Sequence, residues 1–197
     1  MECYSICLPE RIEYVKILEK KIKNPIYIFN AIDGKKHIDE FKDFKHVLPS
    51  ETISAGMIGC LLSHIEVLKN AKTNILIFED DCEYVSDCSE FIKENCIFDI
   101  LLLGTNENVD FTLQNSKFVK VKRFWGTHAL YVKYSTIEGI LKIYEKYKSR
   151  KIFLPADWLY SYAIKEHNLR AFAPLNPKQY FKQKSGLVSS INGKVRN

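Results

Sequence analysis

The run from Ile75 to Asp81, I-L-I-F-E-D-D, constrains the fold more than any other part of this sequence. Its four apolar residues predict a buried β-strand, and the carboxylates of Glu79, Asp80 and Asp81 follow directly. Adjacent carboxylates repel one another, so holding them together costs free energy unless a cation lies among them. Ligands of open α/β sheets bind at the carboxyl ends of the strands. The run therefore predicts a divalent-metal site at a sheet edge, together with a phosphorylated substrate.

Strands and helices are expected to alternate along most of the chain. Apolar runs predict strands over residues 4–8, 25–29, 75–78, 98–103, 118–121, 129–132 and 169–172. Apolar residues at helical spacing predict helices over residues 11–21, 56–71, 135–147 and 158–166, and a short helix around Phe91. Residues 35–54 are polar and lysine-rich and should hold little regular structure. The β-α-β-α-β beginning implies an α/β fold whose central sheet is mostly parallel and flanked by helices.

The length of 197 residues suits a single domain, which we expect to span residues 1–176. From Pro177 the chain is basic and polar and carries Gly186 and Gly193. Residues 177–197 are therefore expected to form a C-terminal tail that is mobile without a ligand. No apolar run approaches the roughly 20 residues that span a bilayer, and the first residues do not resemble a signal peptide. We expect a cytoplasmic protein, with peripheral membrane association left open.

Charge and cysteine content exclude some classes of function. The net charge is +5, but the lysines are scattered and form no basic stripe, so nucleic-acid binding is not expected. The charge favours anionic ligands or an anionic membrane surface only mildly. None of the six cysteines belongs to a C-x-x-C pair, so their spacing does not predict a zinc site. Reduced thiols are expected.

The acidic run suggests how a cation could be held. Glu79 and Asp81 are two residues apart, and residues i and i+2 of an extended stretch point to the same side. The two carboxylates could therefore share one cation or one nucleotide. Hard oxygen ligands suit Mn²⁺ or Mg²⁺, which bind substrate phosphates. The alternative is an acidic turn after the strand, in which Asp80 caps the next segment.

Two further stretches have both a functional and a structural interpretation. Gly56 and Gly59 at the start of a helix allow a ligand or another backbone to approach closely, and helix N-termini attract anions. His64 lies one turn after Cys60 at the border of the apolar stripe, where periodicity alone favours an ordinary packed residue. Asp33 follows the second strand, where an acid can bind ribose hydroxyls, although an ordinary Asp-Gly turn is the better explanation of this stretch taken alone.

Taken together, these stretches resemble glycosyltransferase family 25, which includes bacterial lipooligosaccharide galactosyltransferases and collagen galactosyltransferases. The resemblance covers nearly the whole chain, and the G-C-x-x-S-H motif is its most specific element. The motifs that carry it are, in chain order, Tyr4-Ser5-Ile6-Cys7-Leu8-Pro9-Glu10-Arg11, Ala31-Ile32-Asp33-Gly34, Gly59-Cys60-Leu61-Leu62-Ser63-His64, Ile77-Phe78-Glu79-Asp80-Asp81, residues 99–104, Gly126-Thr127-His128-Ala129-Leu130-Tyr131 and Pro155-Ala156-Asp157. Cys7 stands where the family usually has Asn, and Met57 where an acidic residue often follows the glycine.

The resemblance implies a Rossmann-like glycosyltransferase A fold and a metal-dependent, inverting transfer from a UDP-sugar, often UDP-galactose. The acceptor would be a glycan, a lipid-linked glycan or a protein side chain, and the oligomeric state is open. Residues 1–104 would form the nucleotide-sugar half and residues 105–176 the acceptor half. With Mn²⁺ or Mg²⁺ as cofactor, Asp81 and Glu79 would be the metal ligands, and Asp157 the catalytic base. Candidate donor-binding residues are Arg11, Asp33, Ser63, His64, Glu79, Asp80, Thr127 and His128.

Other functions remain to be separated from this one. Asp157 precedes an expected helix, so it could instead be an ordinary N-cap. The chain could also be a catalytically inactive sugar- or nucleotide-binding relative on the same fold. A metal-dependent phosphohydrolase also places acids at strand ends, but it usually has an aspartyl nucleophile at an early strand end, where this chain has Cys7-Leu8-Pro9.

Overall fold

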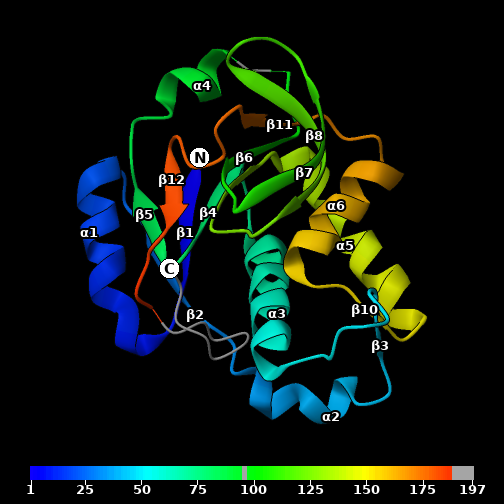
Figure 1. The fold of residues 1–197 in the computed structure, drawn as a ribbon. Coiled ribbons are helices and arrows are strands. Elements are labelled where there is room, and N and C mark those ends of the chain that lie inside the picture. Colours follow the sequence, from blue (N-terminus) through cyan, green and yellow to red (C-terminus); the bar gives the residue numbers. More distant parts are fainter. Residues whose placement is uncertain (95–96, 188–197) are drawn as a thin grey trace.

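The centre of the molecule is one twisted sheet of eight strands, which Figure 1 shows in the computed structural model of the chain; residues 1–94 and 97–187 are described. The strand order is β2-β1-β4-β9-β6-β11-β8-β7. The pairings leave six strands pointing the same way, with only β8 and β9 opposed to them. The strands are β1 (Glu2–Cys7), β2 (Tyr27–Asn30), β4 (Ile75–Glu79), β6 (Ile100–Gly104), β7 (Glu107–Leu113), β8 (Phe118–Trp125), β9 (Ala129–Val132) and β11 (Ala171–Pro174). The prediction of an α/β fold with a mostly parallel sheet is confirmed.

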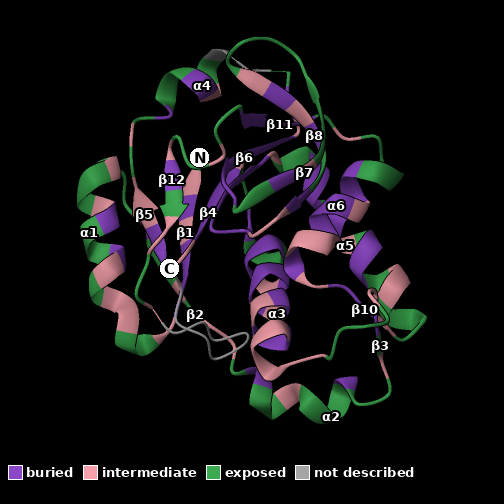
Figure 2. Cartoon of the chain, viewed as in Figure 1, coloured by how far each residue is buried: buried purple, intermediate pink, exposed green. Residues whose placement is uncertain are grey.

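Helices cover both faces of this sheet (Figure 1). One face carries α1 (Ile12–Ile22) and α4 (Ser89–Glu94), and the other carries α3 (Ala55–Asn70), α5 (Tyr134–Ser149) and α6 (Ala156–Glu166). The helices pack through their apolar stripes, and their buried faces point toward the sheet in Figure 2. The helices predicted from periodicity are all present, and their ends differ from the predicted ones by at most two residues.

The side chains of strand β4 pack into both hydrophobic clusters, one on each face of the sheet. Ile75 and Ile77 belong to the apolar cluster under α3, α5 and α6, whereas Leu76 and Phe78 belong to the cluster under α1 and α4. Because successive side chains of a strand point to opposite faces, a continuous apolar run is required wherever helices cover both faces. All four residues are buried, as the sequence predicts.

The carboxyl ends of the first three parallel strands meet at one edge of the sheet. Ser5 of β1 pairs with Ile28 of β2 and with Phe78 of β4, so the three strands end at nearly the same level. The chain segments that leave this edge begin at Leu8, Ala31 and Asp80. These segments carry the motifs that the sequence marked as candidates, and the edge is where they are brought together.

Short elements complete the fold. The region 35–54 contains a 3-10 helix (Gly34–His37), one turn of helix α2 (Ile38–Phe41) and the strand β3 (Lys45–His46), which pairs with β10 (Ile152–Phe153). A second 3-10 helix (Pro9–Arg11) precedes α1. Among the described residues, none of the helices has both the length and the apolar character that a bilayer crossing requires.

Part of the expected C-terminal tail is a strand. β12 (Phe181–Gln183) pairs antiparallel with β5 (Cys82–Tyr84), directly after the acidic run. Phe181 is buried against Phe78, with 5.2 Å between the ring centroids, and this contact fixes the segment on the domain. The ordered chain therefore extends past residue 176, and the last residues of the expected tail, 188–197, lie outside the described part.

Candidate active site

Two glycines bring the loop after β2 against the start of α3. A Cβ atom on Gly34 would lie 1.9 Å from the carbonyl oxygen of Ala55, and one on Gly59 would lie 2.4 Å from that of Ile32. Both distances are far below any real carbon–oxygen contact, so only glycine fits at either position. The motifs A-I-D-G and G-C-x-x-S-H are thus two halves of one contact.

Ser63 holds the same contact from the next turn of α3. Its hydroxyl accepts a hydrogen bond from the Ile32 N–H at 2.8 Å and donates one to the Gly59 carbonyl at 2.7 Å. The side chain is fully buried. Ser63 was predicted to bind the donor, and the structure shows it joining the loop to the helix that borders the site.

The middle acid of the run is held by the first strand. Asp80 accepts a hydrogen bond from the Leu8 N–H at 2.8 Å and forms an ion pair with Arg11 at 2.9 Å. Burial raises the pKa of Asp80, while the Leu8 N–H and the Arg11 guanidinium lower it in part. Asp80 thus does not cap the next segment, and its charge already has a cationic neighbour.

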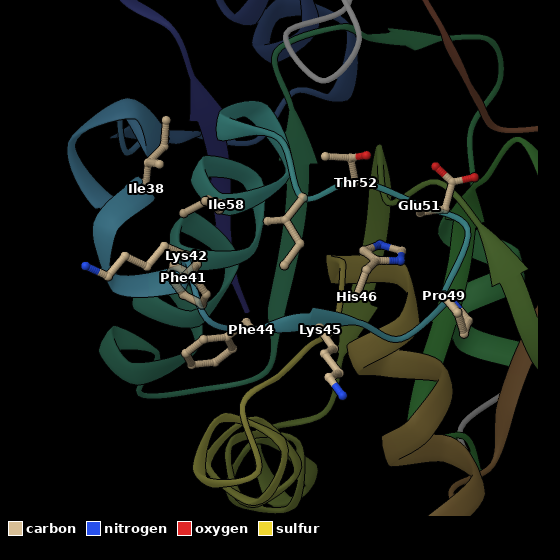
Figure 3. Close-up of a pocket in the computed structure, with 11 residues that line it drawn as sticks. Ile38, Phe41, Lys42, Phe44, Lys45, His46, Pro49, Glu51, Thr52 and Ile58 are labelled. Carbon is tan, nitrogen blue, oxygen red and sulfur yellow. The ribbon is translucent and has the colours of Figure 1, made fainter.

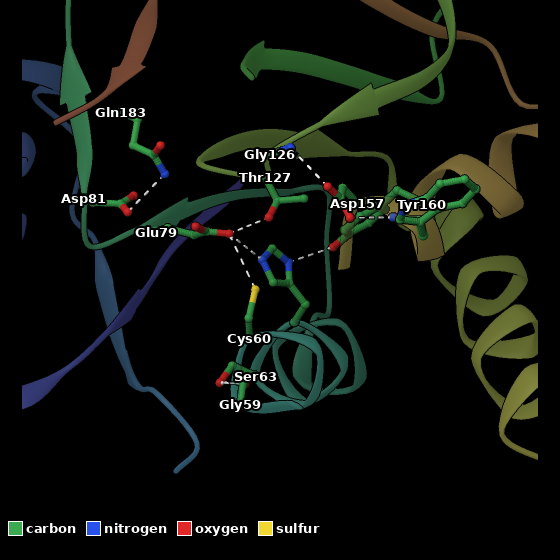
Figure 4. Close-up of polar contacts among 12 residues, drawn as sticks. Gly59, Cys60, Ser63, Glu79, Asp81, Gly126, Thr127, Asp157, Tyr160 and Gln183 are labelled. Atoms are coloured by element: carbon green, nitrogen blue, oxygen red, sulfur yellow. Dashed lines mark hydrogen bonds and ion pairs between the residues drawn. The ribbon is translucent and has the colours of Figure 1, made fainter. Parts of the chain in front are cut away.

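Glu79 lies at the centre of a polar network (Figure 4). Its Oε1 lies 3.3 Å from Nε2 of His64 and 3.8 Å from Sγ of Cys60, and it accepts a hydrogen bond from the Thr127 hydroxyl. Burial opposes ionisation of Glu79, but the hydrogen bonds from His64 and Thr127 outweigh it and hold its pKa below the usual range. Glu79 is therefore an anion surrounded by donors.

His64 is fixed on both sides of its ring. Nδ1 lies 3.1 Å from the hydroxyl of Tyr160, and the two rings meet edge to face at 5.7 Å between centroids. The ring is fully buried. His64 is therefore a packed residue that also contacts the acidic run at Glu79, and its role in donor binding stays a prediction.

The carboxylates of Glu79 and Asp81 face different partners. β4 ends at Glu79 and the chain turns at Asp80, so the stretch is not extended there and the i, i+2 argument does not apply. In Figure 4 Glu79 points toward α3, while Asp81 points toward Gln183 of β12. Gln183 Nε2 donates to Oδ2 of Asp81 at 3.3 Å, and the Lys184 N–H donates to its carbonyl at 2.7 Å.

Asp157 joins α6 to the turn between β8 and β9. Its carboxylate accepts hydrogen bonds from the N–H groups of Gly126 at 3.2 Å and Trp158 at 2.9 Å (Figure 4). α6 begins at Ala156 with Pro155 as its N-cap, so Asp157 is not the N-cap that the sequence left open. Burial raises the pKa of Asp157 and the Glu79 charge acts in the same direction, while the two N–H donors oppose this.

His128 is buried beside Gly104. A Cβ atom on Gly104 would lie 2.9 Å from Cδ2 of His128 and 2.8 Å from Cβ of Phe181, so Gly104 packs closely against both residues. The side chain of His128 is buried, and within the described part of the chain neither ring nitrogen has a hydrogen-bond partner. Burial lowers the pKa of His128 to about 4, so the ring is neutral near pH 7.

A pocket of about 440 Å³ opens at this edge of the sheet. Its walls come from the three segments that leave β1, β2 and β4 and from the first turns of α3. Asp33 lies on its rim and accepts a hydrogen bond from the Lys35 N–H at 3.0 Å. Of the residues predicted from the sequence, those that line the pocket are Arg11, Asp33, Ser63, Glu79, Asp80 and Asp81.

The remaining predicted residues lie behind or beside the pocket. Thr127 and His64 contact Glu79, which lines the pocket. Asp157 is close enough for the Glu79 charge to raise its pKa, and His128 is buried beside Gly104. A separate pocket of about 490 Å³ lies between α2 and the loop before α3 (Figure 3), and none of the predicted residues lines it.

Sequence reasoning missed Cys60 and Tyr160 as members of the site. Cys60 precedes His64 by four residues, a spacing that places both on one face of a helix and could have marked them as a pair. The signal was hidden because cysteine in an apolar helix is usually a small packed residue. Tyr160 comes from a helix almost a hundred residues away, and no local pattern connects it to His64.

Comparison with solved structures identifies the fold. A glucose-1-phosphate thymidylyltransferase from Bacillus anthracis, in complex with a sucrose, matches with a TM-score of 0.51 and 9% identity over 88% of this chain and 86% of its own. Mouse xyloside xylosyltransferase 1 in its apo form matches with a TM-score of 0.47 and 10% identity over 85% of this chain and 69% of its own. A search among curated proteins finds no match.

The family comparison covers most of the sequence. The model of glycosyltransferase family 25 (LPS biosynthesis protein) matches residues 1–175. This range contains the sheet, the flanking helices and every residue of the pocket described above. The Rossmann-like glycosyltransferase A fold expected from the motifs agrees with both findings. The chain belongs to glycosyltransferase family 25.

Proposed function

We propose that this protein transfers a sugar, galactose in the first instance, from a UDP-sugar to a hydroxyl group of a glycan, a lipid-linked glycan or a protein side chain, with inversion at the anomeric carbon. The observation that carries the proposal is the 440 Å³ pocket at the carboxyl ends of β1, β2 and β4. Nucleotide ligands of open α/β sheets bind at such an edge. Family membership supports the transfer reaction, and galactose is proposed because the motifs resemble those of the family's galactosyltransferases.

The pocket has groups suited to both ends of a nucleotide diphosphate. Ala55 and Gly56 at the start of α3 line it, and the N-terminus of a helix attracts phosphate. Arg11, which also lines the pocket, adds a cation. Asp33 on the rim is suited to accept hydrogen bonds from ribose hydroxyls. These roles place the diphosphate between α3 and the acidic run, and the uridine toward the loop after β2.

Within the acidic run, Asp81 is the residue best suited to bind a divalent cation. This carboxylate is buried at the turn after β4, lines the pocket and offers hard oxygen donors, the ligand type that Mn²⁺ and Mg²⁺ prefer. A cation bound there would neutralise charge on the departing UDP. Asp80 is neutralised in part by Arg11. Glu79 was predicted as the second ligand, but its carboxylate faces Cys60, His64 and Thr127.

Asp157 is our candidate for the base that takes the proton from the acceptor hydroxyl. Its raised pKa suits a group that must accept a proton, and the N–H groups of Gly126 and Trp158 hold its carboxylate in place. Trp158 contacts Trp125 at 5.4 Å between ring centroids, and Arg123 lies over its ring. Such an aromatic group next to the base is suited to pack against an acceptor sugar.

The test is binding and turnover of a panel of UDP-sugars with and without Mn²⁺. We expect one UDP-sugar to bind in a metal-dependent way, with slow release of UDP as water replaces the acceptor. Asp81→Asn should abolish the metal dependence, while Asp39→Asn on the exposed helix α2 should leave it unchanged. Calorimetry measures the binding, and a coupled UDP assay measures the release.

Other outcomes would assign the fold to a different function. If a sugar binds equally well with and without metal, and equally well in Asp81→Asn, the protein is a binding protein without catalysis. Phosphate release from simple monoesters would indicate a phosphohydrolase. Either result contradicts the proposed transfer.

A further inference from the structure

Cys60, His64 and Glu79 place three potential metal-binding atoms together beside the pocket. Sγ of Cys60, Nε2 of His64 and a carboxylate oxygen of Glu79 all lie within 4.8 Å of one another. Cys60 and His64 are one turn apart on α3, and Glu79 comes from the end of β4 (Figure 4). The spacing of the cysteines alone did not predict a zinc site, because two of the three ligands are not cysteines and one is remote in sequence.

Two of the three distances among these atoms are close to those between neighbouring ligands of a tetrahedral metal site. Around zinc, bonds of about 2.3 Å to sulfur and about 2.1 Å to nitrogen or oxygen put neighbouring ligands roughly 3.3 to 3.6 Å apart. The observed distances are 3.3 Å from Nε2 to Oε1 and 3.8 Å from Sγ to Oε1. A good N–H···O hydrogen bond is shorter, about 2.9 Å. Both separations therefore suit ligands of a common cation, which would replace the hydrogen bonds that His64 and Cys60 form with Glu79.

We propose that Cys60, His64 and Glu79 form a binding site for Zn²⁺ or a similar thiophilic divalent cation, separate from the carboxylate of Asp81. A thiolate and an imidazole select zinc or cobalt over Mn²⁺ and Mg²⁺. The thiolate and the carboxylate together carry two negative charges, which balance those of the cation in a largely buried place. Three protein ligands leave a fourth position for water or a substrate oxygen.

Neighbouring groups already hold these ligands in position. The Tyr160 hydroxyl contacts Nδ1 of His64, the kind of outer partner that orients a metal-bound imidazole. The Thr127 hydroxyl holds the Glu79 carboxylate. Cys60 and Glu79 both line the 440 Å³ pocket, so a cation can enter from that side. On binding, the Cys60 thiol releases its proton to solvent, and the imidazole proton moves from Nε2 to Nδ1, where it is donated to the oxygen of Tyr160.

The experiment is a titration of the metal-free full-length protein with Co²⁺, followed by absorbance and then by Zn²⁺ competition. No nucleotide sugar is present, so the result does not depend on the proposed transferase activity. We expect one Co²⁺ per chain with a thiolate-to-cobalt charge-transfer band and the intense visible bands of tetrahedral cobalt. Stoichiometric Zn²⁺ should displace it, and the same concentration of Mn²⁺ should not.

Variants separate this site from other cysteines and from the acidic run. Cys60→Ser, which keeps a hydrogen-bond donor, should abolish the charge-transfer band and weaken zinc binding by more than about ten-fold, since even loss of an outer-shell partner costs this much. Cys88→Ser, at another buried cysteine, and Asp81→Asn should both keep the band. Circular dichroism and thermal unfolding confirm that each variant is folded. A wild-type protein without the band, or a band that survives in folded Cys60→Ser, would overturn the proposal.

Discussion

The guanidinium of Arg11 lies 2.9 Å from the carboxylate of Asp80, across 69 residues of sequence. This ion pair ties the turn after β1 to the turn after β4 and so fixes two walls of the pocket relative to each other. It also gives the three adjacent acids different roles, since Asp80 faces Arg11, Glu79 faces α3 and Asp81 faces β12.

Asp80→Asn should therefore destabilise the fold. The change keeps the volume but removes the charge beside a largely buried guanidinium, and we expect a loss of about 1 to 3 kcal/mol in the free energy of unfolding. Urea unfolding measures it. The matched control is Glu83→Gln, whose ion pair with Lys182 at 3.6 Å is partly exposed and should change stability by about 0.5 kcal/mol or less. If Asp80→Asn matches this control and loses only donor binding, Asp80 is a donor ligand and not a structural link.

Gly59→Ala should separate α3 from the loop after β2. The new methyl group would meet the Ile32 carbonyl oxygen at 2.4 Å, and backbone on both sides must shift. We expect a loss of about 1 to 3 kcal/mol in the free energy of unfolding and weaker UDP binding. Gly139→Ala on α5 is the control, since its methyl group would meet only the His167 ring at 3.3 Å. Equal stability of the two variants in thermal unfolding would show that the close approach is not required.

Asp157→Asn should abolish transfer and spare donor binding. An amide cannot accept the acceptor proton, and loss of a general base costs about 10²- to 10⁴-fold in kcat. UDP binding by calorimetry should stay near the wild-type value. Because burial raises the pKa of Asp157, wild-type transfer should fall as pH decreases through a value above that of an ordinary aspartate. If transfer survives in Asp157→Asn, Asp157 is not the base, and its role is to connect α6 to Gly126.

His128 should make the protein less stable in mild acid. Its pKa is about 4 in the folded protein and 6.5 in an unperturbed histidine, so between these values the unfolded chain binds a proton that the folded chain does not. Stability therefore falls as pH decreases through this window, by up to about 1.4 kcal/mol per pH unit. His128→Gln should flatten the dependence measured by urea unfolding at a series of pH values. His167→Gln, at an exposed histidine, should keep the wild-type slope, and a slope that persists in His128→Gln would assign the effect to another group.

Local sequence patterns predicted the helices and strands that are packed against the core along their length. Strand β9 has the predicted bounds, 129–132, and α3 differs by one residue at each end, because both are packed along their length. Strand β7 was missed since it lies at the sheet edge and most of its residues are exposed, which leaves no apolar run to detect. The sequence predicts no strand at β12, because the position of this segment depends on its pairing with β5 and on its contact with the Phe78 ring and not on its own residues.

The sequence by itself determined the α/β class, the buried strand that delivers three acids to a sheet edge and, through ordered motifs, the glycosyltransferase family. These follow from spacing along the chain, which fixes the face of a strand or helix on which each side chain lies. The tertiary structure decided what each acid contacts. Arg11, Gln183 and the pair Cys60 and His64 reach the run from positions 15 to 102 residues away. The partners of a carboxylate depend on which helices and strands pack beside it, and the sequence of the acidic run does not predict these neighbours.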